Sequence, residues 1–287
     1  MRFDPVCAAR RYHPSIASVR LLACDLDGTL CRPDGTVSER TRAALRAAVA
    51  ADVQVVLVTG RPPRFVERAA GQTGVEGPVI CSNGAVVYDW AGDVVLDART
   101  MQPHEFVLTV GIVRTIVPGV ALAIEWDTAF TFERRFAELI GREGVPVADD
   151  VLDHEGAPPH KLLAIHAELD QEALASALTP PLADQLTVTH SGLPFIEMGP
   201  RGVTKATGLA SWCARQDVRA EEVVAFGDMP NDIPMLRWAG WGVAMGNGHV
   251  ETLEAADEVT ATNDEDGVAI VVERLLRDGG YTASAAS

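Results

Sequence analysis

Two carboxylates stand close together in the stretch LLACDLDGTL, residues 21–30, directly after an apolar run. Asp25 and Asp27 are separated by one residue, so on an extended chain their side chains point to the same side. An aspartate at the end of a strand is often turn chemistry. The same pair could instead hold a cation or divide nucleophilic and acid–base work, and the rest of the chain decides between these possibilities.

Polar or small residues follow several other apolar runs in the same way. Thr59 and Gly60 follow VQVVLV, Asn83 follows VICS, and Asp228 follows VVAFG, with Asn231 and Asp232 on the first turn of the helix predicted next. In open α/β sheets, ligands bind outside the carboxyl ends of the parallel strands. We therefore expect these side chains to surround one crevice together with Asp25 and Asp27.

Several carboxylates in one crevice raise one another's pKa values unless a cation offsets their charge. A hard divalent ion with oxygen ligands meets that need, and Mg²⁺ suits a site that keeps waters and takes a phosphate oxygen. Lys205, at the start of a predicted helix, supplies a point charge for a phosphate. A carboxylate nucleophile, a metal, a cation and hydroxyl or amide donors together favour phosphoryl transfer.

The elements that must position these residues alternate between strands and helices. Strands are predicted within 19–25, 53–60, 77–84, 221–228 and 240–246, and helices within 38–52, 62–74, 203–217, 231–239 and 265–277. Ser38 is the expected N-cap of the first helix. Continuous runs of Val, Ile and Leu separated by helices indicate a parallel sheet covered on both faces.

The middle of the chain has a different pattern. A hairpin is predicted for 85–98, strands for 162–169 and 185–192, and helices for 103–116 and 170–179. The fold class is therefore α/β, with a Rossmann-like parallel-sheet core formed by 1–84 and 195–287. An α+β cap is inserted at 85–194, and we expect it to close over the crevice and select the leaving group.

Composition and charge exclude several classes. The net charge of −16 argues against a general affinity for nucleic acid or for anionic membranes. Five cysteines without a CxxC pair fit reduced thiols in the cytoplasm, and residues 1–18 lack the apolar stretch of a signal peptide. The apolar segment 107–124 contains Arg114 and Pro118-Gly119, which favour a helix, a turn and a strand over a membrane span.

Other candidate residues have simpler explanations. The segment 149–160 gathers acidic residues and histidines, but its spacing matches no rigid metal site, so we expect a solvated cap loop. Trp90, Trp126 and Phe130 could line a substrate pocket or form the core of the cap. A phosphate-binding GxxxxGK[ST] loop and a complete GxGxxG are both missing, which counts against ATP-dependent and dinucleotide-dependent enzymes.

Five motifs in order resemble those of the haloacid dehalogenase superfamily: DLDGTL (25–30), VTGR (58–61), SNGA (82–85), Lys205 within GVTKATGL, and GDMPND (227–232). GVAMGNG (242–248) and TNDEDGVA (262–269) resemble C-terminal signatures of its sugar-phosphatase-like Cof subfamily, subfamily IIB. One DxD alone would be weak, but five motifs in this order are specific. The resemblance implies the fold of that superfamily with a cap of the C2 type.

The resemblance also implies roles. Asp25 would be the nucleophile that forms an aspartyl-phosphate, and Asp27 the acid and base that serves the leaving alcohol and the water. Thr59 and Lys205 complete the implied catalytic set. The implied phosphate-binding or loop-positioning residues are Gly60, Asn83, Asn231 and Asn263, and the implied Mg²⁺ ligands are Asp25, Asp228, Asp232 and the backbone carbonyl of Asp27.

The predicted function is a Mg²⁺-dependent phosphatase that acts on a small phosphorylated metabolite, such as a sugar phosphate. One alternative is a phosphomutase or phosphotransferase, in which a second hydroxyl replaces water, although SNGA is less like the mutase branch, which tends to have Glu before Asn-Gly. Another is a non-catalytic sensor of a phosphorylated ligand. Retention of Asp25, Asp27, Lys205 and Asp228 opposes the sensor.

Overall fold

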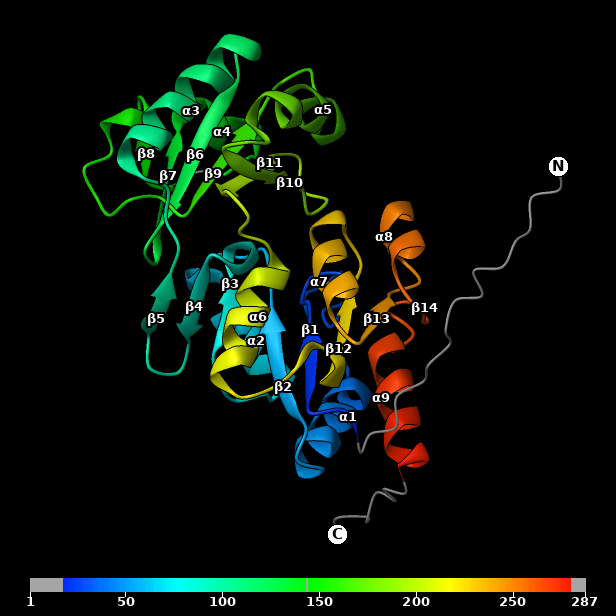
Figure 1. Cartoon of the computed structure of the whole chain (residues 1–287). Helices are drawn as coiled ribbons and strands as arrows, with labels where there is room; N and C mark the ends of the chain where they lie inside the picture. Colours follow the sequence, from blue (N-terminus) through cyan, green and yellow to red (C-terminus); the bar gives the residue numbers. More distant parts are fainter. Residues whose placement is uncertain (1–17, 143, 280–287) are drawn as a thin grey trace, which may run out of the picture.

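The molecule contains two β-sheets, and in the view of Figure 1 the smaller sheet lies above the larger one. The computed structural model describes residues 18–142 and 144–279. Residues 1–17 lie outside the described part. Cys7 is among them, and so are all but one of residues 1–18, for which the sequence predicts no signal peptide. Within the described residues, every helix is too short or too polar to span a bilayer.

The larger sheet has eight strands in the order β14-β13-β12-β1-β2-β3-β4-β5. Their bounds are β1 Leu21–Cys24, β2 Gln54–Val58, β3 Val79–Cys81, β4 Val86–Asp89, β5 Val94–Ala98, β12 Val223–Gly227, β13 Trp241–Ala244 and β14 Glu258–Val259. The strands from β14 to β3 are parallel to their neighbours, and β4 and β5 are antiparallel. This confirms the predicted parallel α/β core.

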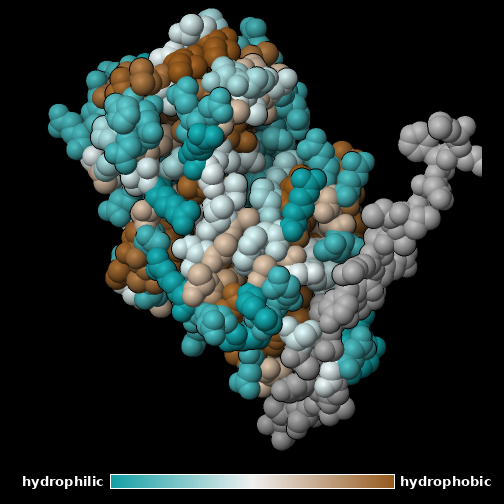
Figure 2. All heavy atoms as spheres, in the orientation of Figure 1, coloured by the Kyte–Doolittle hydropathy of each residue, from teal (hydrophilic) through white to brown (hydrophobic). Residues whose placement is uncertain are grey.

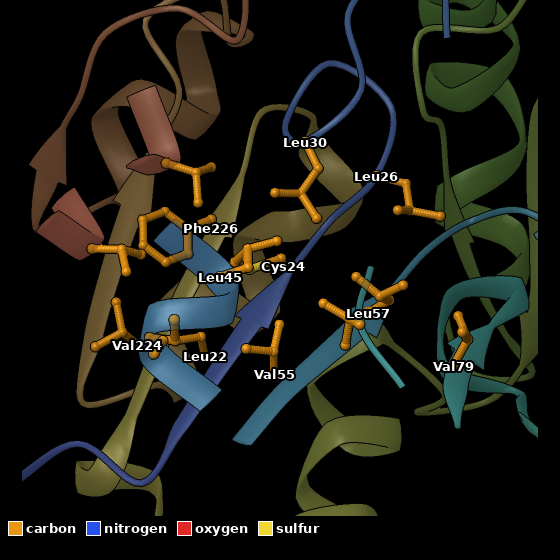
Figure 3. Close-up of a cluster of buried hydrophobic side chains, with 14 of the residues drawn as sticks. Leu22, Cys24, Leu26, Leu30, Leu45, Val55, Leu57, Val79, Val224 and Phe226 are labelled. Carbon is orange, nitrogen blue, oxygen red and sulfur yellow. The ribbon is translucent and has the colours of Figure 1, made fainter. Parts of the chain in front are cut away.

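Helices cover both faces of this sheet, as predicted. α1 (Glu39–Ala50), α2 (Glu67–Thr73) and α9 (Gly267–Asp278) pack on one face, and α6 (Lys205–Arg215), α7 (Ile233–Trp238) and α8 (Val250–Ala255) on the other. Leu22 and Cys24 point to the first face and Leu21 and Ala23 to the second, as strand alternation requires. Figure 3 shows the first of these clusters around Leu45 of α1.

The smaller sheet has six strands in the order β10-β11-β9-β6-β7-β8. Their bounds are β6 Ala121–Trp126, β7 Ala129–Glu133, β8 Val147–Ala148, β9 Lys161–Ile165, β10 Leu186–Thr189 and β11 Ile196–Pro200. α3 (Pro103–Ile116) and α5 (Gln171–Leu182) pack on one face, and α4 (Arg134–Leu139) packs on the other. Figure 2 shows apolar patches over α3 and over the edge strand β5.

Strand pairing moves both predicted domain boundaries. The hairpin predicted for 85–98 forms, but β4 pairs with β3 and extends the larger sheet, so it is part of the core. Residues 195–287 were assigned to the core, yet Ile196–Pro200 forms β11, which pairs with β9 and β10 inside the smaller sheet. By sheet membership, the cap therefore begins after Ala98 rather than at 85 and ends after Pro200 rather than at 194.

Local signals explain several element ends. Ser38 accepts a hydrogen bond from the amide of Thr41 and caps α1, which confirms the predicted cap. The prolines before α2 form a 3₁₀ turn, Pro63–Phe65, so the α-helix starts later than predicted. The segment 107–124 is the end of α3, a turn and β6, as predicted.

Gly84 and Gly208 allow the chain after β3 to touch the start of α6. Gly84 has a φ of +95°, and a Cβ there would lie 2.1 Å from the carbonyl oxygen of Thr204. A Cβ on Gly208 would lie 2.6 Å from the Cα of Gly84. Only glycine fits this approach, which brings Asn83 near Lys205.

We predict that Gly84→Ala lowers the free energy of unfolding by roughly 3 kcal/mol, because it combines left-handed strain with an overlap against backbone. Gly74 is the matched control, since it has a φ of +71° but nothing within 4 Å. Gly74→Ala should cost about 1 kcal/mol. Urea unfolding measures both, and equal losses would contradict the close contact.

Candidate active site

Lys205 is the charged centre of the site. It is the first residue of α6, whose N-cap Thr204 accepts a hydrogen bond from the amide of Thr207. The Lys205 side chain is only 1% exposed, and its Nζ donates to Oδ1 of Asp25 and to Oδ1 of Asp232, each at 2.6 Å. The burial and both contacts tie α6 to the end of β1 and to the turn before α7.

Asp25, Asp228 and Asp232 form a buried carboxylate cluster. One oxygen from each lies within 4.8 Å of the others. Asp228 Oδ1 accepts a hydrogen bond from Thr29 Oγ1 at 3.1 Å, and Asp232 Oδ2 accepts from the amides of Asp228 and Met229 at 3.0 Å. These bonds fix the turn Gly227–Asp232 so that two of its carboxylates face the nucleophile candidate.

The charge balance of the cluster fits a divalent cation. Burial raises the pKa of Asp25 well above its usual value, against the lowering effect of Lys205. Burial and the neighbouring Asp232 raise the pKa of Asp228 to about 7. Three carboxylates share a single lysine, and their oxygens are the donors that hard divalent cations prefer. Among the described residues, this is the one His/Cys/Asp/Glu group that could hold a metal ion.

Asp27 lies outside this cluster. Its carboxylate accepts two hydrogen bonds from Arg61, from Nε at 2.7 Å and from Nη2 at 2.5 Å. Asp27 and Arg61 line the same cavity as Asp25. The implied metal contact of the Asp27 backbone carbonyl stays a prediction.

The predicted phosphate-binding residues of the core are mostly brought together. Thr59 and Gly60 directly follow β2 and line the cavity with Asn231. The amide of Asn83 donates to the carbonyl oxygen of Thr59 at 3.0 Å, and the side chain of Asn231 donates to Oδ1 of Asn83 at 3.0 Å. Asn83 itself has a positive φ of 56°, a conformation that asparagine tolerates better than most residues.

Asn263 has a different placement. Its Nδ2 donates to the carbonyl oxygen of Cys31 at 2.8 Å, and its amide donates to Asn247 Oδ1 at 2.9 Å. Asn247 in turn donates to the carbonyl oxygen of Gly28. Of the two roles predicted for Asn263, these contacts favour positioning of the loop that follows β1, because the residue does not line the cavity.

A cavity of 720 Å³ lies above the carboxylates, between core and cap. Asp25, Asp27 and Lys205 line its core side, and Phe130, Phe132 and Leu163 belong to its cap wall. Phe130 therefore lines a pocket and also belongs to an apolar cluster of the cap, so both predicted alternatives hold for it. Trp90 packs against the core of the larger domain, and Trp126 lies against His154.

A second buried charge cluster was missed by sequence reasoning. Lys161 Nζ lies 2.8 Å from Glu197 and 3.6 Å from Glu125, and it donates to the carbonyl oxygen of Gly60 at 2.6 Å. Glu125 accepts from Ser82 at 3.0 Å, and Glu197 accepts from the side chain of Asn83 at 2.5 Å. The cap is thereby bonded to the segments after β2 and β3 of the core.

Opposite charges favour the ionised forms of Lys161 and Glu197, whereas burial raises the pKa of Glu125. Burial pulls the pKa of Lys161 down, but Glu125 and Glu197 outweigh it and hold the pKa above its usual value. The available signal in the sequence was a single charge inside each of three apolar runs, AIEW, HKLLAI and FIEM. Charged residues are rarely fully buried unless they are paired, so each isolated charge implied a partner.

The predicted cap loop 149–160 carries no metal-binding group among the described residues. Asp150 instead pairs with Arg114 at 2.8 Å, while Asp149 is highly exposed. These positions agree with the solvated loop expected from its spacing.

The strand ends of a parallel α/β core carry the carboxylates, Lys205 at the start of α6 lies among them, and an α+β cap closes over the site. This arrangement is that of a phosphoryl-transfer enzyme with a cap domain. Residues 22–272 match the haloacid dehalogenase-like hydrolase family. The chain therefore belongs to that family, which confirms the resemblance predicted from its five motifs. Members of the family typically use a divalent metal, for which the carboxylate cluster supplies a place.

Relatives match over nearly their whole length. The chain is 32% identical to 5-amino-6-(5-phospho-D-ribitylamino)uracil phosphatase YitU of Bacillus subtilis, covering 87% of this chain and 94% of YitU. It is 30% identical to pyridoxal phosphate phosphatase YbhA of Escherichia coli, covering 88% and 97%. The solved structure of the phosphatase BT1666 from Bacteroides thetaiotaomicron aligns with a TM-score of 0.78 at 26% identity, covering 95% and 99%. The protein is a hydrolase of the phosphatase type that these relatives represent.

We predict that Lys161→Met lowers the free energy of unfolding by about 3 kcal/mol or more, because it leaves two buried carboxylates without their counter-charge. Arg40→Met is the matched control, since Arg40 pairs with Glu273 at 2.7 Å on the surface and should contribute less than about 1 kcal/mol. Urea unfolding compares the two variants. Adding Glu197→Gln to Lys161→Met should recover part of the loss, and no recovery would contradict the charge explanation.

Proposed function

We propose that the protein is a Mg²⁺-dependent phosphatase that hydrolyses a small phosphorylated metabolite through an aspartyl-phosphate on Asp25. The observation that carries this proposal is the Asp25 carboxylate, held at 2.6 Å by Lys205 beside Asp228 and facing the cavity under the cap. Lys205 lowers the pKa of this buried carboxylate against the effect of burial, and a cation bound beside it would further favour the anion that attacks phosphorus.

In the first step, a carboxylate oxygen of Asp25 attacks phosphorus and the bond from phosphorus to the leaving alcohol oxygen breaks. Asp27, which lines the same cavity, gives its proton to that oxygen. Thr59 and the amide of Gly60 donate to the phosphoryl oxygens, and Lys205 offsets their charge.

In the second step, water attacks the phosphorus of the aspartyl-phosphate. Asp27 takes the proton of that water, and the bond between phosphorus and the Asp25 oxygen breaks. Inorganic phosphate leaves and both aspartates return to their starting states. In this second step, where Asp27 acts as a carboxylate base, Arg61 holds that carboxylate beside the cavity.

Asp25, Asp228 and Asp232 would hold the Mg²⁺, together with the backbone carbonyl of Asp27. When bound, the ion supplies positive charge that stabilises the developing charge on the phosphoryl oxygens. The fit rests on the three oxygens within 4.8 Å and on their burial, which with the neighbouring carboxylates raises the pKa of Asp25 and Asp228 and which a bound cation would offset.

The proposed substrates are small phosphorylated metabolites, sugar phosphates included. YitU and YbhA are named as phosphatases of two such compounds. The net charge of −16 disfavours nucleic acid and anionic membranes as partners. Cys24, Cys31, Cys81 and Cys213 are buried free thiols, which supports a cytoplasmic location.

We predict that Asp25→Asn lowers the rate of phosphate release by about 10³-fold or more, because an amide is a far weaker nucleophile than a carboxylate. Phosphate release from a panel of phosphorylated metabolites with Mg²⁺ measures this loss. Asp184→Asn is the control, since that cap carboxylate is 99% exposed. An Asp25→Asn enzyme with the wild-type rate would rule out the covalent mechanism, and transfer of phosphate to a second alcohol instead of water would favour the phosphotransferase alternative.

We also predict that Mg²⁺ raises the unfolding temperature, by an amount equivalent to about 2.7 kcal/mol when its concentration is 100 times the dissociation constant. Asp228→Asn should abolish most of this rise and should stabilise the metal-free protein, because it removes a buried charge that Asp232 repels. Thermal unfolding with Mg²⁺ and with EDTA tests both effects. A full Mg²⁺ shift in Asp228→Asn would place the metal elsewhere, and Asp184→Asn should keep the shift.

A further inference from the structure

Three arginines gather at the mouth of the cavity, in a protein with a net charge of −16. Arg64 and Arg68 belong to the core segment after β2, and Arg142 belongs to the cap segment after α4. Among the described residues, none of the three has a carboxylate partner within ion-pair distance. Their positive charge is therefore available to something that enters the cavity.

Two of these arginines, Arg64 and Arg142, contact phenylalanine rings, and Arg68 lines the same cavity. We call the group of Arg64, Arg68 and Arg142 with Phe65 and Phe130 the arginine clasp. The guanidinium carbon of Arg64 lies 4.2 Å from the ring centre of Phe130 and 5.6 Å from that of Phe65. Arg142 lies 5.3 Å from the ring centre of Phe65, and the two rings are 5.8 Å apart. An arginine placed over a ring keeps its in-plane N–H groups free, and that fork matches phosphate and carboxylate oxygens.

The other charges at the mouth leave the clasp positive. Arg61 is already paired with Asp27, and among the described residues Glu67 is the one further exposed carboxylate that lines the cavity. Three arginines against one glutamate leave a local excess of positive charge. Neighbouring guanidinium groups repel one another, and a bound anion would offset this repulsion.

The scissile phosphoryl group does not account for the clasp. Lys205, 1% exposed, serves that group at the floor of the cavity, whereas the clasp arginines are exposed at its mouth. We infer that the substrate carries a second anionic group, a phosphate or a carboxylate, and that Arg64, Arg68 and Arg142 bind it while Asp25 receives the first. This inference rests on the proposed phosphatase function and narrows its substrate class.

The clasp also joins the two domains. Arg64 and Phe65 come from the core, and Phe130 and Arg142 from the cap. A second anion bound between them would bridge cap and core, so substrates with two anionic groups should favour the closed cavity. A substrate with one phosphate lacks that bridge.

The test compares matched compounds that differ by one anionic group. Fructose 1,6-bisphosphate is paired with fructose 6-phosphate, and 3-phosphoglycerate with glycerol 3-phosphate. Each compound is assayed both for its kcat/KM and for its inhibition constant against p-nitrophenyl phosphate. We expect at least a 10-fold preference for the two-anion member in at least one pair, and the pair that shows it distinguishes a second phosphate from a carboxylate.

Variants assign that preference to the clasp. Arg64→Gln with Arg142→Gln should bring the ratio between two-anion and one-anion compounds close to one, and Arg64→Lys with Arg142→Lys should restore it in part. Arg201→Gln is the control, because this arginine directly after the cap is 68% exposed and lies outside the cavity. The inference is overturned if the wild type has equal kcat/KM and equal inhibition constants for the two members of each pair, or if their ratio is unchanged in the glutamine variant. The phosphatase function stands in either case. A protein that hydrolyses none of these phosphates, p-nitrophenyl phosphate included, overturns the proposed function as well.

Discussion

The burial of one ammonium group between two carboxylates is the constraint on which the site depends. Lys205 can stay charged inside the protein only while Asp25 and Asp232 remain at 2.6 Å, so three distant chain segments must meet. The contact of Gly84 with Thr204 brings the third strand end to the same place. Because apolar residues of similar volume often stabilise a core as well as buried ion pairs do, this arrangement points to function rather than to stability.

The cap repeats this arrangement with the same stoichiometry, one lysine between two carboxylates. Lys205 has two aspartate partners in the core, and Lys161 has two glutamates in the cap, yet Lys161 also bonds the carbonyl oxygen of Gly60. Asn83 joins the networks, since its side chain contacts Glu197 on one side and Asn231 on the other. The position of the cap and the geometry of the loops proposed to bind phosphate are therefore set by the same hydrogen bonds.

Local patterns were enough to predict the residues at the strand ends, and pairing between distant strands was not. Asp25, Thr59 and Asp228 follow apolar runs, and parallel strands carry such ends to one edge. The hairpin of β4 and β5 was recognised, but nothing within it shows that its partner is β3 rather than the cap. Lys161 looked like an isolated charge, because its partner Glu197 is 36 residues away.

Charge placement explains how a strongly acidic protein can take an anionic substrate. Exposed charges farther apart than about 8–10 Å are largely screened at physiological salt, so the net charge of −16 acts weakly inside the cavity. The electrostatic potential inside the cavity is set mainly by nearby charged groups. Its basic residues are the arginines at the mouth, Lys161 in the cap wall and Lys205 at the floor. An entering anion thus meets first the clasp arginines, which have no carboxylate partner among the described residues. Lys161 and Lys205, by contrast, are each paired with two carboxylates, and a cation in the carboxylate cluster would offset the charge that remains at the floor.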